Sequence, residues 1–303
     1  MKGCPLAEFE MYRPGELRIS ESPFGPELAI DRAWSSQLTS LCEDKKIMSL
    51  VLLRLSKIER PNLDFLTDVP WLKQFTLLDQ AIDDIEGIHH LRELRSIGMS
   101  DYSKKPIDFS RFPHLQKCYI EFVKGRSSVG SCTSLERLSL QHYSFKDLSP
   151  LSALSRLEKL WFSQGSLGNI SDIGAFPRLT DLSLMLLRNL RDISPLSTLK
   201  HIERLNLQKS KGFNQLDSLA TLSSLRTLSI VDCGEIESLT PLEDCRNLEE
   251  LHFGGDTTIV DGDLSVLTRL PNLKEVLFRT RRSYNLRGED IPAYHSYRSP
   301  SPC

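Results

Sequence analysis

Residues 135–140 of this 303-residue chain are Leu-Glu-Arg-Leu-Ser-Leu, a spacing of apolar residues that decides the fold. The same L-x-x-L-x-L spacing recurs at residues 157–162, Leu-Glu-Lys-Leu-Trp-Phe, and at residues 202–207, Ile-Glu-Arg-Leu-Asn-Leu. With other apolar residues allowed at the leucine positions, eleven such units begin, 20 to 25 residues apart, at Ile47, Leu72, Leu94, Leu115, Leu135, Leu157, Leu179, Ile202, Leu225, Leu248 and Leu273. Self-similarity at this period is typical of a solenoid, in which each repeat packs on its two neighbours.

Each unit predicts one short strand, because its apolar positions 1, 4 and 6 point inward while positions 3, 5 and 7 point outward. The return half of a repeat adds inward leucines, such as Leu148 and Leu151. Three returns begin Ser149-Pro150, Ser194-Pro195 and Thr240-Pro241, where we expect the hydroxyl to cap a helical turn and the proline to suit its first position. The predicted fold is therefore an α/β solenoid, a horseshoe of about eleven repeats with a parallel sheet on its concave face and short helical turns on its convex side.

The two ends of the chain depart from the repeat. Residues 1–46 fit no unit, and the stretch Ser22-Pro23-Phe24-Gly25-Pro26 followed by residues 34–41 predicts a hairpin and a short helix that form an N-terminal cap. Residues 47–281 form the repeat array, and residues 282–303 are rich in Ser, Tyr, Arg and Pro, which predicts a flexible C-terminal tail.

Composition excludes several classes of protein. With 51 leucines, 26% charged residues and a net charge of -2, the chain is a folded protein with no electrostatic bias toward nucleic acid or an anionic membrane. Its apolar runs are far shorter than the roughly 18 residues of a membrane helix, and the N-terminus has no apolar signal region. The seven cysteines include no C-x-x-C pair, so we expect buried thiols rather than a metal site, and a cytoplasmic location.

No motif for catalysis is present. The sequence has no phosphate-binding glycine loop, nucleophile elbow or paired carboxylate motif, and the two histidines on strand segments, His142 and His252, are five repeats apart. We therefore expect no enzyme activity, no cofactor and no metal.

The returns D-L-S-P-L at residues 147–151 and D-I-S-P-L at residues 192–196 resemble the short-repeat class of the leucine-rich repeat superfamily, which includes internalins and a regulatory subunit of protein phosphatase 1. Residues 258–264 and 278–284 are similar to irregular bacterial cytosolic leucine-rich repeat proteins, some of which act as immunity proteins against secreted toxins. The ninth repeat position, usually Asn or Cys in the superfamily, departs from this pattern at Tyr102, Tyr143, Gly165, Leu187, Ser210, Cys233 and Asp256. We therefore expect looser and less uniform turns.

The outward strand positions predict a binding surface. Trp161 stands between two serines at position 5, where a large aromatic residue can anchor a partner, although its own neighbours could instead cover it. Position 3 carries Arg137, Lys159 and Arg204 with Asp181 among them. This row either attracts an acidic partner or is a solvated surface compensated by the adjacent glutamates Glu136, Glu158 and Glu203. The predicted partner-binding residues are Tyr119, Arg137, His142, Lys159, Trp161, Met185, Arg204 and Asn206.

Three functions remain open at this point. The first is a protein-binding module, monomeric when free, whose concave face holds one protein; neutralisation of a toxin is one role for such a module. The second is a regulatory or scaffold subunit of a host enzyme such as a phosphatase. The third, in which the Arg279-Thr280-Arg281-Arg282 segment binds nucleic acid, is disfavoured because acidic residues (Asp232, Glu250, Asp256, Glu275) make the face bipolar.

Overall fold

The computed structural model describes residues 17–53, 62–78, 82, 84–100 and 105–296, which fall into two compact units, 1–135 and 136–303. Every predicted repeat supplies one strand, and each strand begins at the third position of its unit. In the first unit these strands are β3 (Ser49–Leu52), β4 (Gln74–Leu77), β5 (Ser96–Met99) and β6 (Lys117–Glu121). In the second they are β7 (Arg137–Tyr143), β8 (Lys159–Gly165), β9 (Asp181–Met185), β10 (Arg204–Asn206), β11 (Thr227–Val231), β13 (Glu250–Gly254) and β15 (Glu275–Phe278).

The strands of each unit pair in parallel with equal repeat positions opposite one another. Arg137 pairs with Lys159, Lys159 with Asp181, and Asp181 with Arg204. Inward leucines such as Leu138 and Leu140 are buried, which stabilises the fold by about 2 kcal/mol for each side chain relative to exposure. The fold class predicted from the sequence, an α/β leucine-rich repeat solenoid, is therefore confirmed.

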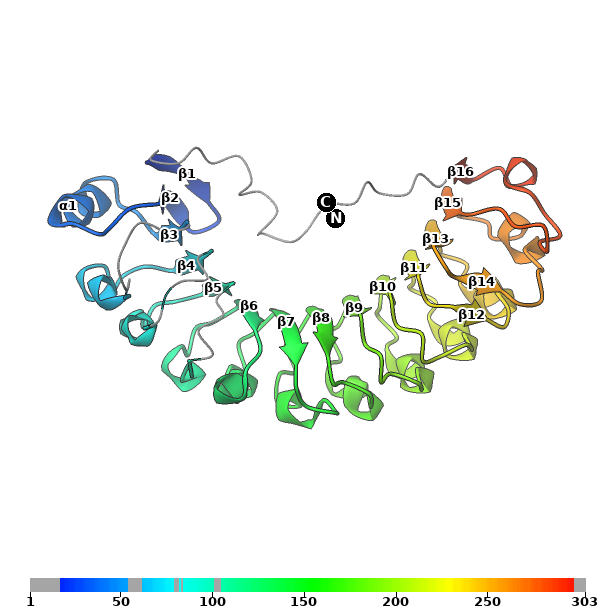
Figure 1. Ribbon diagram of the computed structural model, residues 1–303, viewed down its shortest axis with the longest axis horizontal. Helices are drawn as coiled ribbons and strands as arrows, with labels where there is room; N and C mark the ends of the chain where they lie inside the picture. The colour runs from blue at the N-terminus through cyan, green and yellow to red at the C-terminus, as the bar shows by residue number, and fades with distance from the viewer. Residues whose placement is uncertain (1–16, 54–61, 79–81, 83, 101–104, 297–303) are drawn as a thin grey trace. The chain divides into compact units, whose positions relative to one another are not determined.

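Short 3₁₀ turns close the repeats on the side away from the strands (Figure 1). They are η2 (Asp64–Asp68), η3 (Glu86–His90), η4 (Phe109–Arg111) and η5 (Lys124–Ser131) in the first unit. The second unit has η6 (Ser149–Leu151), η7 (Ser171–Ala175), η8 (Ser194–Thr198), η9 (Asp217–Thr221), η10 (Thr240–Asp244) and η11 (Ser265–Thr268). Two further strands, β12 (Glu235–Ile236) and β14 (Thr258–Ile259), pair in parallel behind the main sheet of this unit.

The predicted caps of these turns were wrong about the capping atom. Proline lies in the first turn as expected, but the amide of Ser149 donates to the Oδ1 atom of Asp147 at 3.1 Å, two residues earlier. The amide of Ser194 donates in the same way to Asp192 at 2.8 Å. Hydrogen bonds from the serine side chain, and then from the serine amide, hold the pKa of both carboxyl groups below its usual value. An aspartate side chain can accept the backbone amide two residues later, as in an Asx turn, so it caps this amide in place of the serine hydroxyl.

In six consecutive repeats of the second unit the backbone at the end of the strand is uniform, contrary to the expectation of looseness. The eighth repeat position has a left-handed φ of 54° to 65° in six consecutive repeats, at His142, Gln164, Leu186, Lys209, Asp232 and Gly255. Buried hydroxyls also replace the missing asparagines. Ser210 Oγ accepts the amide of Leu187 at 3.1 Å, and Thr257 Oγ1 accepts the amide of Cys233 at 2.9 Å. The turn backbone is therefore satisfied without an asparagine ladder.

The N-terminal repeats begin on an antiparallel hairpin, β1 (Arg18–Ser22) and β2 (Gly25–Ile30), whose second strand pairs in parallel with β3. The helix α1 (Ser36–Asp44) follows it, and just before this helix the Trp34 ring stacks on Phe65 with centroids 4.5 Å apart. Residues 1–16 lie outside the described residues.

The C-terminal end differs from the predicted flexible tail. Residues 282–296 contain the turn η12 (Gly288–Asp290) and the strand β16 (Tyr294–Ser296), which pairs in parallel with β15. Tyr284 is buried and its hydroxyl accepts the amide of Ile259 at 3.2 Å. Aromatic rings in this segment cover the end of the core, since Phe278 packs edge-on against Tyr294 at 5.1 Å. The remaining residues of that prediction, 297–303, lie outside the described part.

Candidate functional site

The outward side chains of positions 3, 5 and 7 on β7–β10 form a surface that we call the sheet face. The parallel register places Arg137, Lys159, Asp181 and Arg204 in one row across the four strands. The adjacent row contains Ser139, Trp161, Ser183 and Asn206. Met185 lies in the next row, opposite Ser163. The structure therefore brings together six of the eight predicted partner-binding residues.

Asp181 organises the sheet face. Its Oδ1 atom accepts a hydrogen bond of 2.9 Å from the indole Nε1 of Trp161, and its Oδ2 atom lies 3.0 Å from Arg204 Nε. Lys159 Nζ lies 3.9 Å from the same Oδ2 atom. The Asp181 side chain is only 14% exposed, whereas that of Arg204 is 45% exposed. The carboxylate thus holds three predicted binding residues in fixed positions.

The positive charge of the position-3 row is partly compensated by an acidic residue of the same row. Arg137, Lys159 and Arg204 carry three positive charges and Asp181 one negative charge, which leaves a net charge of about +2. The prediction that neighbouring glutamates supply the compensation is replaced by this cross-strand arrangement, because Asp181 forms the ion pairs with Lys159 and Arg204. An acidic partner would still meet a positive surface.

Trp161 is half-buried on this face. Ser139 and Ser183 oppose it on the adjacent strands, and both are too small to cover an indole ring. The bond to Asp181 satisfies the indole N–H, so the ring needs no further polar partner. A ring held in one orientation with part of its surface accessible loses little entropy when a partner covers it.

Two polar atoms on the sheet face lack a hydrogen-bond partner among the described residues. They are Arg137 Nε, a donor, and Asn206 Oδ1, an acceptor, and both atoms are buried. A buried polar group without a partner costs about 1–3 kcal/mol of stability. Both residues belong to the set predicted from the sequence.

The other two predicted residues are not among these positions on β7–β10. His142 occupies the left-handed eighth position, where it is exposed and its Nε2 atom lies 2.7 Å from Gln164 Oε1. It lies near the end of β7, at a repeat position outside positions 3, 5 and 7, which define the sheet face. Tyr119 lies on β6 in the first unit, opposite Gly98 of β5, and is half-buried there.

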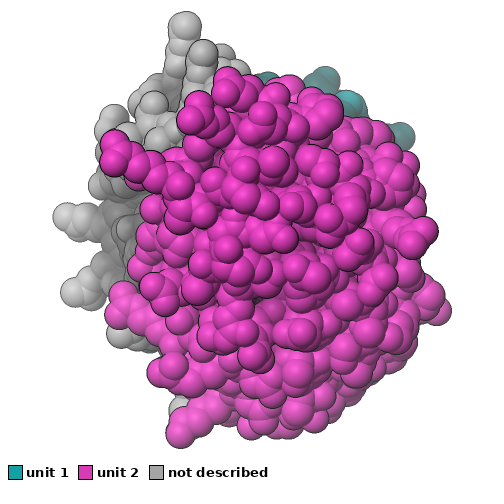
Figure 2. All heavy atoms as spheres, turned by 90° about the vertical axis from the view of Figure 1, so that its right-hand side faces the viewer, with its two compact units in different colours: residues 1–135 teal, residues 136–303 magenta. Residues whose placement is uncertain are grey.

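The acidic C-terminal strands are partly neutralised. His252 Nε2 lies 2.9 Å from Glu275 Oε1, and Asp256 pairs with Lys211. At the strand entrance, hydrogen bonding and charge from Lys274, together with the charge of Arg226, hold the pKa of Glu249 below its usual value. Of the four acidic residues predicted for this end of the second unit (magenta in Figure 2), Asp256 is thus paired with Lys211, and Glu275 contacts His252.

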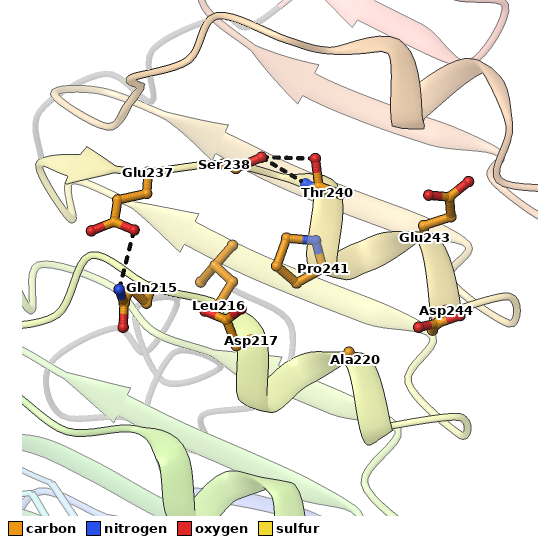
Figure 3. A pocket seen from close by; sticks show the side chains of 10 residues that line it. All are labelled: Gln215, Leu216, Asp217, Ala220, Glu237, Ser238, Thr240, Pro241, Glu243 and Asp244. Atoms are coloured by element: carbon orange, nitrogen blue, oxygen red, sulfur yellow. Dashed lines mark hydrogen bonds between the residues drawn. The ribbon is translucent and has the colours of Figure 1, made fainter.

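A groove of about 430 Å³ on the turn side of the second unit was not predicted (Figure 3). It lies between η9 and η10, and its polar lining includes Asp217, Glu237 and Asp244. Gln215 Nε2 donates to Glu237 Oε2 at 3.2 Å. In the described ranges no three acidic, histidine or cysteine side chains are arranged to hold a metal ion.

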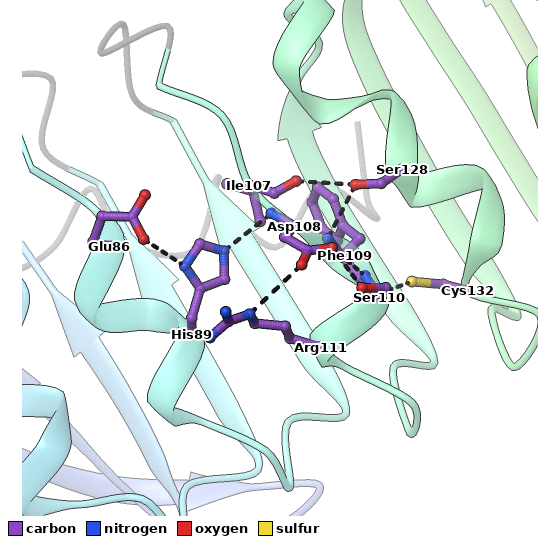
Figure 4. A network of polar contacts seen from close by, with 9 residues as sticks. All are labelled: Glu86, His89, Ile107, Asp108, Phe109, Ser110, Arg111, Ser128 and Cys132. Carbon is purple, nitrogen blue, oxygen red and sulfur yellow. Dashed lines mark hydrogen bonds and ion pairs between the residues drawn. The ribbon is translucent and has the colours of Figure 1, made fainter.

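A polar network in the first unit was also not predicted from the sequence (Figure 4). His89 is buried, and its Nε2 atom accepts the amide of Asp108 at 3.0 Å. The proton must therefore reside on Nδ1, which lies 3.0 Å from Glu86 Oε2. The contact with Asp108 joins η3 to the start of η4 in the next repeat, whereas the contact with Glu86 lies within η3. Its only sequence signal was a histidine at the turn position where other repeats have residues such as Gly174, Ser197 and Ala220.

Comparison with known proteins shows similarity at the level of the fold. No protein-family model and no curated protein matches the chain. An internalin, InlF, from Listeria monocytogenes is 18% identical, with a TM-score of 0.61 over 86% of this chain and 76% of that chain. The functional domain of InlJ from the same organism is 17% identical, with a TM-score of 0.56 over 80% of this chain and 52% of that chain.

A receptor structure shows the same similarity. TLR13, in its complex with ssRNA13, is 19% identical, with a TM-score of 0.54 over 82% of this chain and 37% of that chain. These likenesses show that the chain has the leucine-rich repeat fold. In the ranges that the structure describes, no helix has the length and apolarity needed to cross a bilayer.

Proposed function

We propose that the chain is a non-enzymatic protein-binding module whose sheet face holds one partner through acidic side chains of that partner. The observation that carries this proposal is the cluster around Asp181, in which Trp161, Lys159 and Arg204 are held together on one surface. Trp and Arg are the residues most often found to dominate the energy of protein interfaces.

The partner would use two kinds of contact. An apolar group would cover the accessible part of Trp161, and carboxylates would meet Arg204 and Arg137 at the edges of the cluster. The net positive charge of the row would speed the encounter with an acidic surface, an effect that added salt would weaken. Replacing Trp161 by Ala should therefore reduce affinity at any ionic strength, whereas reversing the charge of Arg137 should reduce it mainly at low ionic strength.

Within this proposal, inhibition of a toxin is the first candidate role, in the cytoplasm. The alternative role, regulation of a host enzyme such as a phosphatase, was suggested by the D-L-S-P-L and D-I-S-P-L returns. The aspartates of these returns have a structural role, because each accepts the amide of the serine two residues later. The aspartates of these two returns are therefore explained by the fold and do not by themselves indicate a phosphatase partner. The experiment below distinguishes regulation of an enzyme from inhibition of a toxin.

The experiment is a capture of partners from the native host with three forms of the full chain. The wild type is compared with Arg137→Glu/Trp161→Ala and with a control, Arg156→Glu/Arg178→Glu, whose arginines are exposed away from the sheet face. Circular dichroism and thermal unfolding establish that all three are folded. We expect a partner that the wild type and the control retain and the sheet-face variant loses. Equal retention by all three forms would show that the sheet face is not the binding surface.

An activity assay on the captured protein then separates the two roles. A partner with toxic activity that the wild type suppresses and the sheet-face variant does not would establish inhibition. A partner whose activity persists or is redirected would establish a regulatory or scaffold role.

A further inference from the structure

A basic pocket opens beyond the C-terminal ends of β9, β10 and β11, outside the sheet face. It has a volume of about 600 Å³, and its charged lining consists of Arg188, Arg191, Lys209, Lys211, Asp232 and Asp256. All six residues belong to the second unit and come from four consecutive repeats. None lies in an L-x-x-L-x-L segment, which explains why the repeat pattern did not reveal them.

The carboxylates of this pocket already have partners. Asp256 forms an ion pair with Lys211, and this hydrogen bond and charge raise the pKa of the Lys211 ammonium group. The Oδ1 atom of Asp232 accepts the amide of Asp256 at 3.1 Å. Four cations and two carboxylates leave a net charge of about +2. The excess resides on Arg188, Arg191 and Lys209, which are exposed and form no ion pair with any described residue.

The backbone holds these cations in a fixed arrangement. The amide of Leu186 donates to Gln208 O at 2.9 Å and that of Lys209 to Val231 O at 3.0 Å, so the parallel register continues into the turns. Gly212 packs so closely on the preceding repeat that a Cβ atom there would lie 2.0 Å from Leu190 O. By this register Arg188 and Lys211 occupy equivalent positions in adjacent repeats, at a spacing of about 4.8 Å.

Arg188, Arg191 and Lys209 carry like charges around one pocket, and a bound anion would relieve their repulsion. Two guanidinium groups can each donate two parallel hydrogen bonds to phosphate oxygens, and a lysine adds a point charge. A phosphoryl group carries about -1.5 to -2 charges at neutral pH, which matches the excess charge of the pocket better than a single carboxylate does. We infer that this pocket binds a phosphoryl group.

The phosphoryl group has two possible sources, a small phosphorylated molecule and a phosphorylated side chain of a protein. Three probes distinguish them, namely inorganic phosphate, pyrophosphate, and the acetylated tripeptide glycyl-phosphoseryl-glycine with its unphosphorylated form as control. Binding to the full chain is measured by titration calorimetry and by thermal unfolding, at constant ionic strength so that general screening does not contribute.

The test variant is Arg188→Gln/Lys209→Gln, and the matched control is Arg156→Gln/Arg178→Gln, which removes the same charge from exposed positions outside the pocket. We expect saturable binding of at least one phosphorylated probe, retained by the control and weakened at least tenfold by the test variant. Tighter binding of the phosphopeptide than of the inorganic ions would indicate a protein source, and the reverse order a small molecule. Unsaturable binding of every probe, or binding equal in wild type and test variant, would overturn the inference.

The sheet-face variant Arg137→Glu/Trp161→Ala provides an independent check. Because its substitutions lie outside the pocket, we expect it to bind the phosphorylated probe like the wild type. The inference therefore does not depend on the proposed function, and either can fail without the other.

Discussion

Thr257 provides a quantitative test of the buried hydroxyls that replace the asparagine ladder. Its side chain is 1% exposed, and its Oγ1 atom accepts the amide of Cys233 at 2.9 Å and donates to Ile230 O at 2.6 Å. The substitution Thr257→Val keeps the volume and removes both hydrogen bonds. Each bond contributes about 1 kcal/mol, and a buried amide left without a partner costs about 1–3 kcal/mol. We therefore expect the free energy of unfolding to fall by about 2–4 kcal/mol.

The matched control is Thr257→Ser, which keeps the hydroxyl and removes one buried methyl group. Its expected cost is about 1 kcal/mol. Urea unfolding followed by circular dichroism measures both changes, and the slope of the transition reports whether the unit still unfolds cooperatively. The expected order of stability is wild type, then Ser, then Val. A valine variant as stable as the serine variant would refute the role assigned to the hydroxyl.

Three further predictions concern the sheet face, the thiols and the turns. The sheet face is tested in a variant whose two other tryptophans are replaced by phenylalanine. There, Asp181→Ala should shift the fluorescence emission of Trp161 to the red and cost about 1 kcal/mol of stability. Asp181→Asn keeps an acceptor for the indole N–H, so the emission should shift less. Burial raises the thiol pKa to about 11 for Cys42, Cys233 and Cys245 and to about 12 for Cys132, and raises that of Cys118 as well. A Cys4→Ser/Cys303→Ser variant should therefore react with a thiol reagent at pH 8 only after unfolding, and rapid labelling of the native protein would contradict the burial. Hydrogen bonds from serine lower the pKa of Asp108, Asp147, Asp192 and Asp263 below 3.8, so their contribution to stability is present above that pH and is lost as the pH falls through the lowered values. A variant with asparagine at all four positions keeps the acceptor oxygens but loses the groups that titrate. Below pH 4 the urea midpoint of this variant should therefore fall less steeply with pH than that of the wild type. Parallel curves of midpoint against pH would count against these bonds.

The eleven strands and their register could be predicted from the sequence because a solenoid has mainly nearest-neighbour contacts. Once the spacing of Leu135, Leu138 and Leu140 sets which side chains point inward, the next repeat at Leu157 has only one register that buries its own leucines. The same reasoning placed six of the predicted binding residues on one surface, because outward positions follow directly from inward ones.

The features that could not be predicted depend on where polar atoms of different repeats meet. A sequence pattern could not show that Asp181 reaches Trp161 and Arg204, because both contacts join separate strands. The repeat pattern also did not reveal the left-handed backbone at His142, near the end of β7.

The division between the two kinds of information follows from the forces involved. Apolar burial is non-directional, so the periodic leucines by themselves determined the repeat, the strand register and the inward face. Hydrogen bonds and ion pairs depend on distances of a few tenths of an ångström and on angles. The tertiary structure therefore decided which carboxylate caps each turn, which hydroxyls satisfy the buried amides, and how the cations from successive turns gather around one pocket.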